Sequence, residues 1–328
     1  MKLVIVLYHR FELWNAPEWL VPRLEHDFPQ LEITHLPRYE GVEEALRDAE
    51  IAITWSLRPE QFKAARRLRW IHAPAAAVHQ LLFSELVESN VLLTNAREVH
   101  GPIVAEHVIA QIFALAKKFS QAVHLQASKI WGQEALWREK PPPSEVMGAT
   151  LGLIGVGSIG REVAQRAAAL GMRVIAVREH TGKGSPPGVE RVYGPEDLDT
   201  LLSRSDYVVL AAPVTPATRQ LINAERLKKM KPGSYLINVS RGPLVDEEAL
   251  LLSLEQGRLG GAALDVFSKE PLPRESGLWD MKNVLVTPHT AAITAKLWER
   301  HYALIAENLR RYLAHEPLLA LVDKRVGY

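Results

Sequence analysis

One short stretch restricts the fold of this chain more than any other, namely LGLIGVGSIGREVA at 151–164. An apolar strand runs into Gly155, Gly157 and Gly160, and a helical pattern begins at once. Glycines at this spacing allow a tight turn, a close approach of the backbone to a pyrophosphate and close packing of helix on strand. This setting predicts dinucleotide binding rather than an ordinary glycine-rich turn. The expected cofactor contacts of the turn are Gly155, Gly157, Ser158, Ile159 and Gly160.

Short apolar runs alternate with helical patterns on both sides of this turn. Before it, apolar runs fall at 2–8, 31–36, 51–56, 68–74 and 91–96, with helical patterns near 17–28, 41–50, 58–66 and 78–89. From the turn onward, apolar runs fall at 151–155, 173–177, 206–212, 234–239, 261–266 and 283–287. This βαβ rhythm predicts two parallel sheets, each covered by helices on both faces.

Two longer helical segments indicate how the two series are joined. One is predicted over 102–129, with Pro102 in its first turn, and KPPPSEVMGAT at 140–150 follows it as a boundary loop. The other, at about 291–314, carries no signal for a new domain. We expect this last helix to return to the first domain, which would make the N-terminal domain discontinuous.

Composition and charge limit the possible partners. A chain of 328 residues that is 47% hydrophobic can bury two cores, and a net charge of +1 provides no basic field for nucleic acid. The absence of cysteine excludes disulfides and thiolate metal sites, and KLVIVLY near the N-terminus is too short to span a membrane. We therefore expect a cytoplasmic protein without nucleic-acid or membrane partners. We also expect no metal site, because these histidines fall on separate predicted elements: His72, His79, His100 and His107.

The residue after the second strand of the glycine-turn series bears on the choice of cofactor. A dinucleotide fold usually places an acid there, about 20 residues after the glycines, to bind the adenosine ribose. This chain has Arg178, and His180, Thr181 and Lys183 add donors in the same loop. Because a guanidinium can hold a 2′-phosphate with two parallel hydrogen bonds, NADP(H) is predicted over NAD(H). The alternative is that Arg178 is a solvated surface residue and Glu179 binds the ribose, so NAD(H) stays possible.

Three later stretches place polar residues after apolar strands, at the sheet edge where open α/β sheets bind ligands. They are INVSRGPLVDEEAL with Arg241, GGAALDVFSKEPLP with Asp265 and Glu270, and VLVTPHTAA with His289. Taken singly, each residue has an ordinary explanation as a surface turn, a structural histidine or a loop acid. Their joint occurrence behind a dinucleotide turn favours a catalytic interpretation.

The reduction of a 2-oxo acid needs these residue types. Arg241 can hold the substrate carboxylate and polarise the carbonyl. The alkoxide formed by hydride transfer needs a proton, which a histidine such as His289 supplies well near neutral pH. A carboxylate against the second ring nitrogen fixes the tautomer and favours the imidazolium, and Glu270 is the candidate. Asp265 is expected to support this pair or the nicotinamide.

These motifs together resemble the D-isomer-specific 2-hydroxyacid dehydrogenases. The resemblance is carried by GVGSIG, NVSRGPLVDEEAL, GAALDVFSKEPLP, TPHTAA and LLTNAREVHGPIVAEHVIA, and it covers nearly the whole chain. It implies an α/β fold of two doubly wound parallel-sheet domains. A Rossmann cofactor domain at 100–288 would be inserted into a discontinuous, flavodoxin-like substrate domain at 1–99 and 289–328.

The resemblance also implies roles for single residues. Arg241 would bind the substrate carboxylate, Glu270 and His289 would form the acid/base pair, and Asp265 would lie near the nicotinamide. Pro213 is placed among the cofactor contacts. The family further implies a cleft that closes by hinge motion, and a homodimer. Trp131 and Trp137, on the arm after the long helix, are expected to pack a dimer interface, with an aromatic wall for the neighbouring active site as the alternative.

Departures from the family pattern concern the substrate. The family's carboxylate-holding loop often reads AGVD, whereas IHAPAAAVHQLL at 71–82 has Ala77 and His79 at the Gly and Asp places. The backbone amides of Ala76 and Ala77 can still bind a carboxylate. Trp55 stands where phosphoglycerate dehydrogenases tend to place an arginine, although Arg58 could compensate.

These features favour a reductase of small 2-oxo acids of the glyoxylate and hydroxypyruvate kind. The residues expected to contact its substrate are Trp55, Ala76, Ala77, Arg241 and His289. Two alternatives stay open. One is a D-3-phosphoglycerate dehydrogenase-like enzyme, and the other is a non-catalytic, dinucleotide-sensing protein similar to the corepressors that resemble this family.

Overall fold

The structure is a computed structural model that describes residues 1–327, with the side chain of Lys183 excepted. Tyr328, the last residue of the predicted substrate domain, lies outside the described residues. The chain forms two compact units, the first from Met1–His100 and the chain from Thr294 onward, the second from Gly101–Ile293. The chain therefore returns to the first unit after Ile293, later than the expected boundary at 288/289. His289 accordingly belongs to the same unit as Glu270.

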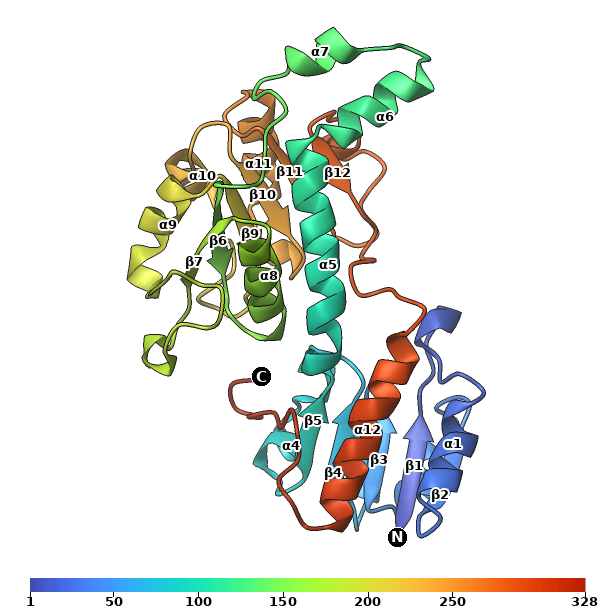
Figure 1. The fold of residues 1–328 in the computed structure, drawn as a ribbon. Coiled ribbons are helices and arrows are strands. Elements are labelled where there is room, and N and C mark those ends of the chain that lie inside the picture. The colour runs from blue at the N-terminus through green and yellow to red at the C-terminus, as the bar shows by residue number, and fades with distance from the viewer. Residues whose placement is uncertain (328) are drawn as a thin grey trace. The chain divides into compact units, whose positions relative to one another are not determined.

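The first unit is built on a five-stranded parallel sheet with the order β2-β1-β3-β4-β5 (Figure 1). Its strands are β1 (Lys2–Val6), β2 (Glu32–Leu36), β3 (Ile51–Thr54), β4 (Trp70–Ala73) and β5 (Leu92–Asn95). Its helices are α1 (Leu20–Asp27), α2 (Val42–Leu46), α3 (Pro59–Ala64), α4 (Ser84–Glu88) and α12 (Leu297–Leu313). β3 and β4 are buried along their whole length, as expected for inner strands covered on both faces.

The second unit contains a seven-stranded parallel sheet with the order β12-β11-β10-β9-β6-β7-β8. Its strands are β6 (Thr150–Ile154), β7 (Arg173–Val177), β8 (Arg191–Tyr193), β9 (Tyr207–Leu210), β10 (Tyr235–Asn238), β11 (Gly261–Leu264) and β12 (Val284–Val286). Its helices are α5 (Arg97–Ala116), which begins in the first unit, α6 (Phe119–Ala127), α7 (Gln133–Trp137), α8 (Ser158–Ala169), α9 (Leu198–Arg204), α10 (Ala224–Lys229) and α11 (Glu247–Glu255).

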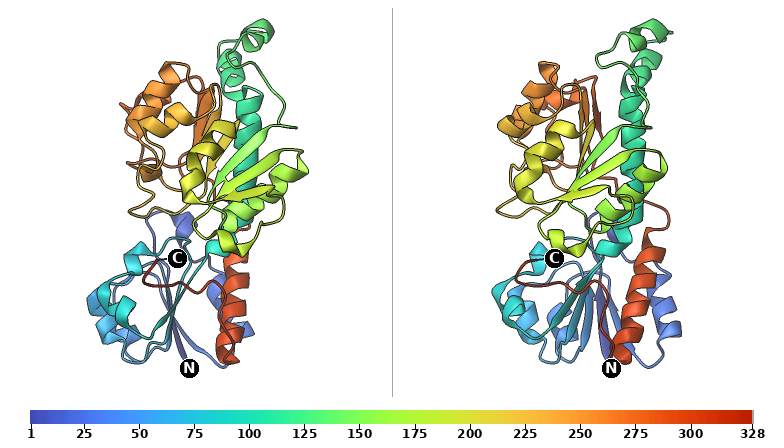
Figure 2. Two further views of the ribbon diagram at one scale, coloured as in Figure 1. Left: turned by 90° about the vertical axis from the view of Figure 1, so that its left-hand side faces the viewer. Right: turned by 60° about the vertical axis from the view of Figure 1, so that its left-hand side comes forward.

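Two hydrophobic cores lie on the two faces of this sheet. One includes buried residues of α9, α10 and α11, and the other includes buried residues of α5 and α8 (Figure 2). Because these strands are parallel, the loops that follow their carboxyl ends lie at one edge of the sheet. Short 3₁₀ turns complete the chain at Glu12–Trp14, His79–Leu81, Thr181–Lys183, Pro195–Asp197, Gly242–Leu244 and Gly277–Trp279.

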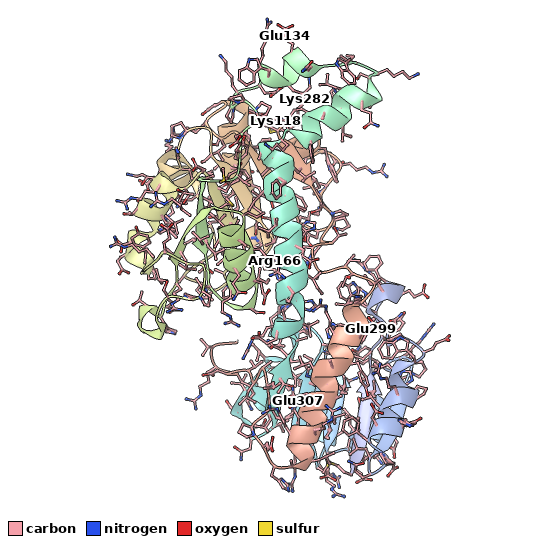
Figure 3. The ribbon with its side chains drawn as sticks, in the orientation of Figure 1. Lys118, Glu134, Arg166, Lys282, Glu299 and Glu307 are labelled. Atoms are coloured by element: carbon pink, nitrogen blue, oxygen red, sulfur yellow. The ribbon has the colours of Figure 1, made fainter. Side chains whose placement is uncertain are left out.

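The prediction of one helix over 102–129 is wrong. α5 ends at Ala116 and α6 begins at Phe119, with Lys118 between them in a left-handed conformation at φ 57 (Figure 3). Lys118 is buried, and its Nζ donates a hydrogen bond to the Tyr235 hydroxyl at 3.1 Å. This long-range contact fixes the bend, and no local sequence signal announces it.

Other details of the second series also differ from expectation. Pro102 lies inside α5 rather than in its first turn, because the helix begins at Arg97. The short edge strand β8 was not predicted. α5 is long and apolar enough to cross a membrane. However, 61% of its apolar 18-residue segment is buried within the protein, as in the core helix of a globular domain.

Candidate active site

The glycine turn between β6 and α8 has the geometry that a dinucleotide needs. Gly155 has φ +95, and a Cβ on it would lie 2.7 Å from the amide nitrogen of Ala212. A Cβ on Gly160 would lie 2.3 Å from the carbonyl oxygen of Gly155, so the helix can pack closely on the strand. Gly157 has nothing within 4 Å of its Cβ position, and it caps α8 without any side-chain hydrogen bond. The turn therefore offers open space and helix N–H donors, which suit a pyrophosphate.

Arg178 follows β7 and organises the loop that comes after it. Its amide donates to the carbonyl of Tyr193 at 3.1 Å, and its Nη2 donates to the carbonyls of Thr181 at 3.3 Å and Gly184 at 2.5 Å. The residue as a whole is partly buried, and its Nε is out of contact with solvent and has no hydrogen-bond partner among the described residues, so Arg178 is not a fully solvated surface residue. Its Nη1 makes no hydrogen bond to a described residue and is the group that could face a 2′-phosphate.

The other expected cofactor contacts also lie in the second unit. Ser158 and Ile159 form the first turn of α8, directly after the open position at Gly157. Pro213 follows β9, is exposed, and accepts a hydrogen bond from the Thr218 hydroxyl at 2.7 Å through its carbonyl. These residues end neighbouring strands of one parallel sheet, so they share its carboxyl edge.

Glu270 and His289 are joined by a side-chain hydrogen bond. The Nδ1 of His289 lies 2.7 Å from Oε2 of Glu270, and the side chains are 49% and 36% exposed. The amide of Phe267 donates to the other oxygen, Oε1, at 3.0 Å. Burial acts to raise the pKa of Glu270, but the hydrogen bonds from His289 and Phe267 and the charges of His289 and Arg241 outweigh it, so this pKa is lowered. Glu270 is therefore a carboxylate that holds the ring and leaves Nε2 of His289 for a substrate.

Arg241 lies after β10, close to this pair. Burial lowers the pKa of its guanidinium, and the negative charge of Glu270 acts in the opposite direction. Asn238 donates to the carbonyl of Arg241 at 3.0 Å, and the guanidinium donates to the carbonyl of Ser240 at 2.6 Å. The next residue, Gly242, must be glycine, because its Cβ would lie 1.9 Å from the carbonyl carbon of Phe267. This close contact of two loops brings the guanidinium into the electrostatic range of Glu270.

Asp265 fixes the loop that carries His289. The side chain is 1% exposed, and its oxygens accept hydrogen bonds from the Thr287 hydroxyl at 2.6 Å and from the amides of Thr290 at 2.8 Å and Ala291 at 3.1 Å. Its carbonyl accepts the amide of His289 at 2.9 Å. His289 has φ +54, a left-handed conformation that costs free energy and persists only where the surroundings impose it. Asp265 thus holds the backbone of the loop that carries His289.

Sequence reasoning missed the side chains behind Asp265. His107 on α5 lies 3.2 Å from the Thr287 hydroxyl and 3.8 Å from Asp265, and Gln111 lies 3.1 Å from the same ring nitrogen. Burial lowers the pKa of His107, and the charge of Asp265 raises it. A signal was present, because His107 and Gln111 are four residues apart and so place two polar groups on one face of a mainly apolar helix.

The expected substrate residues Trp55, Ala76 and Ala77 belong to the first unit, after β3 and β4. The Nε1 of Trp55 donates to the carbonyl of Trp14 at 3.0 Å, and its ring packs edge-on against Trp14 and Trp298. Asn95 donates to the carbonyl of Ala76 at 2.8 Å. These contacts hold the two loops at the carboxyl edge of the five-stranded sheet.

Comparisons with known proteins agree with this arrangement. The family model for the NAD binding domain of D-isomer specific 2-hydroxyacid dehydrogenases matches residues 109–291. A glyoxylate reductase from Thermococcus kodakarensis is 33% identical over 298 residues, which cover 89% of this chain and 88% of that protein.

Solved structures match almost the whole chain, among them the following two. An NADPH-dependent glyoxylate/hydroxypyruvate reductase from Sinorhizobium meliloti, in complex with NADP and sulfate, has a TM-score of 0.82 and 30% identity, covering 100% of this chain and 99% of its own. A D-lactate dehydrogenase from Aquifex aeolicus, complexed with NAD and lactic acid, has a TM-score of 0.74 and 25% identity, covering 96% of each chain.

Fold and site together define an NAD(P)-dependent oxidoreductase with two parallel-sheet α/β domains. The chain belongs to the D-isomer specific 2-hydroxyacid dehydrogenase family. The predictions of fold class, family and enzyme class are confirmed. The neighbours include both NADP-bound and NAD-bound proteins, so the comparisons support a nicotinamide dinucleotide without deciding between the two.

Proposed function

We propose that this protein reduces a small 2-oxo acid, glyoxylate or hydroxypyruvate, with NADPH. The observation that carries the proposal is the 2.7 Å contact between His289 and Glu270, within the electrostatic range of Arg241. The family relatives named glyoxylate reductase and glyoxylate/hydroxypyruvate reductase support this choice of substrate. Trp55 supports it as well, because a bulky ring without a cation is poorly suited to a phosphorylated acid.

Each residue of the constellation has a defined task in the proposed reaction. Arg241 binds the substrate carboxylate with its forked donors and draws electron density from the carbonyl oxygen. A nicotinamide dinucleotide held at the turn of Gly155, Gly157 and Gly160 would supply the hydride for the carbonyl carbon. His289 donates the proton on Nε2 to the oxygen as negative charge develops there, because its Nδ1 is held by Glu270. Glu270 stabilises the charged ring before transfer and keeps its orientation afterwards.

We propose that the amides of Ala76 and Ala77 bind the substrate carboxylate and that Trp55 limits the size of the substrate. Asp265 is assigned to holding His289 in place and, through the same loop, to the nicotinamide end of the cofactor site. We further propose a cytoplasmic homodimer. The exposed Trp131 and Trp137, 93% and 70% accessible, support this assembly, because large apolar side chains gathered on an extended arm suit an interface.

The preference for NADPH is assigned to Arg178. Replacing it with alanine removes the guanidinium that would bind the 2′-phosphate, so the KM for NADPH should rise by about 10-fold or more. The KM for NADH should change little, which makes NADH the matched control within the same variant. A wild-type protein with a higher kcat/KM for NADH than for NADPH would show that Glu179 and the ribose decide the cofactor.

The function is tested by assaying a panel of 2-oxo acids with NADPH and NADH side by side. We expect glyoxylate and hydroxypyruvate to give the highest kcat/KM with NADPH, and hydroxypyruvate to give the D-isomer of its product. A higher kcat/KM for 3-phosphoglycerate oxidation would indicate the phosphoglycerate dehydrogenase alternative. NADPH binding without turnover of any acid would indicate the dinucleotide-sensing alternative.

A further inference from the structure

The second unit has a pocket at the edge of its sheet opposite to the glycine turn. The pocket has a volume of about 630 Å³ and is lined by the first residues of β6, β7 and β8 and by the C-terminal end of α9. α9 lies beside β6 and β7 in Figure 1. The floor consists of the buried side chains of Ile175 and Tyr193. The glycine turn follows the carboxyl end of β6, so this pocket lies at the other edge of the sheet. The backbone of Tyr193 links the two, because its carbonyl accepts the amide of Arg178 at 3.1 Å.

Strand geometry places two arginines on the face of the sheet that carries this pocket. Arg173 and Ile175 are two residues apart on β7, and Arg191 and Tyr193 are two residues apart on β8. Side chains two residues apart on a strand share a face, and Ile175 is paired with Arg191 across the two strands. All four therefore point to the face covered by α9.

Two of the lining cations are balanced by carboxylates. The Nε of Arg173 lies 3.3 Å from Glu190, and the Nζ of Lys231 lies 2.5 Å from Asp206. Exposed ion pairs of this kind are common on protein surfaces and contribute little. These two ion pairs offset the positive charges of Arg173 and Lys231.

Arg191 and Arg204 are different, because neither makes a salt bridge to a carboxylate among the described residues. The guanidinium of Arg191 lies 4.8 Å from the centre of the Tyr193 ring, and Nη1 of Arg204 donates to the Tyr193 hydroxyl at 3.3 Å. One buried tyrosine thus holds two guanidinium groups at one pocket. Both arginines retain further N–H donors for a ligand.

We propose that this pocket binds a small multivalent anion carrying phosphate or carboxylate groups. Guanidinium groups bind such oxyanions through paired, charge-assisted hydrogen bonds, and the volume lies within the range of small-molecule sites. The C-terminal end of α9 contributes a partial negative charge, which offsets part of the positive field. Because two guanidinium groups line the pocket, it should select an anion that engages both arginines over an anion of single charge.

The test is calorimetric titration with pyrophosphate and with citrate, at constant ionic strength and with saturating NADP⁺. Wild-type protein should bind one equivalent at this site, and the R191A/R204A variant should bind about 10-fold more weakly or worse. The R191K/R204K variant should lie between, because lysine keeps the charge and loses the fork. The thermal midpoint without anion shows whether each variant folds, and R191A alone serves if the double variant does not. The stronger of the two probes identifies phosphate or carboxylate as the preferred group.

Matched controls separate this site from the rest of the protein. R66A/R300A removes the same charge from exposed positions in the first unit, and R178A and R241A alter the proposed cofactor and substrate sites. None of these three should change the affinity. The proposal is overturned if neither probe binds, if R191A/R204A binds like wild type, if R178A or R241A abolishes the binding, or if sodium chloride at equal ionic strength gives the same heat and stabilisation.

Discussion

Two histidines, one in each unit, show how surroundings decide what the same side chain can do. His289 is half exposed and hydrogen-bonded to Glu270 at 2.7 Å. His301, on α12, is fully buried, and neither of its ring nitrogens has a hydrogen-bond partner among the described residues. Its neighbours are the rings of Trp298 and His100, at 5.2 Å and 5.5 Å between centroids.

The surroundings of each ring determine whether it can take part in proton transfer. Burial, and then the nearby His100 and His72, lower the pKa of His301 well below its usual value, and burial lowers the pKa of His72 to about 3. These two rings stay neutral in the core, where the Nδ1 of His72 is hydrogen-bonded to the Thr94 hydroxyl at 2.9 Å. His289 has a carboxylate and an open nitrogen, which are the two requirements for proton transfer.

The largest expected effect comes from removing the ring of His289. His289→Ala should lower kcat for glyoxylate reduction by about 1,000-fold, because no other group replaces the proton donor. The Kd for NADPH should stay within about 2-fold of wild type, since the glycine turn is untouched. Steady-state kinetics and fluorescence titration of NADPH give the two values. If His289→Ala keeps the activity of wild type, His289 is not the proton donor, and the two histidines do not differ in catalytic role.

A smaller loss is expected when only the charge beside His289 is removed. Glu270→Gln keeps the size of the side chain but loses the negative charge that favours the imidazolium, so kcat should fall by about 100-fold. Steady-state kinetics of glyoxylate reduction measures this change. A variant with the kcat of wild type would show that Glu270 has no part in proton transfer.

The third change acts on the loop that holds His289. Asp265→Asn leaves one oxygen for three donors and points an amide N–H₂ at backbone N–H groups, at a cost of about 1–3 kcal/mol in the free energy of unfolding. Because the φ of +54 at His289 depends on this loop, kcat should fall as well. Urea denaturation and kcat are measured together. If the variant is less stable but fully active, Asp265 does not position His289 for catalysis.

The smallest effect concerns the buried histidines of the first unit. Since the folded protein holds the pKa of His301 and His72 below the usual value of about 6.5, the unfolded chain binds protons that the folded chain cannot. Stability should therefore be complete above about pH 6.5 and fall by roughly 1 kcal/mol per pH unit for each ring as the pH drops below it. His301→Phe should reduce that slope, and replacing the exposed His124 with glutamine should not. Equal slopes in urea denaturation from pH 7 to 5 would contradict this assignment.

The parts that could be predicted from the sequence are those set by local order. Strand, glycine turn and helix follow one another at 151–164, and polar residues that end parallel strands must meet at one edge, which is why Arg241, Glu270 and His289 could be expected together. The roles of these residues stay predictions until the variants are measured.

Contacts between distant segments could not be predicted. The bend at Lys118 depends on Tyr235, and the buried histidines come together from β4, the start of α5, and α12. The bonds of Asp265 to the loop at 287–291 join a side chain to backbone amides, which leave no mark in residue type. Periodicity and motif spacing report local structure, whereas these contacts depend on how elements far apart in sequence pack.

The most direct test of the central claim is the pH dependence of single-turnover reduction of glyoxylate with NADPH already bound. If His289 donates the proton, the wild-type rate should fall as the pH rises and the ring loses its proton, and the residual rate of His289→Ala should be flat over that range. A wild-type rate that climbs steadily with pH, or a variant with the same profile as wild type, would show that the proton comes from another group.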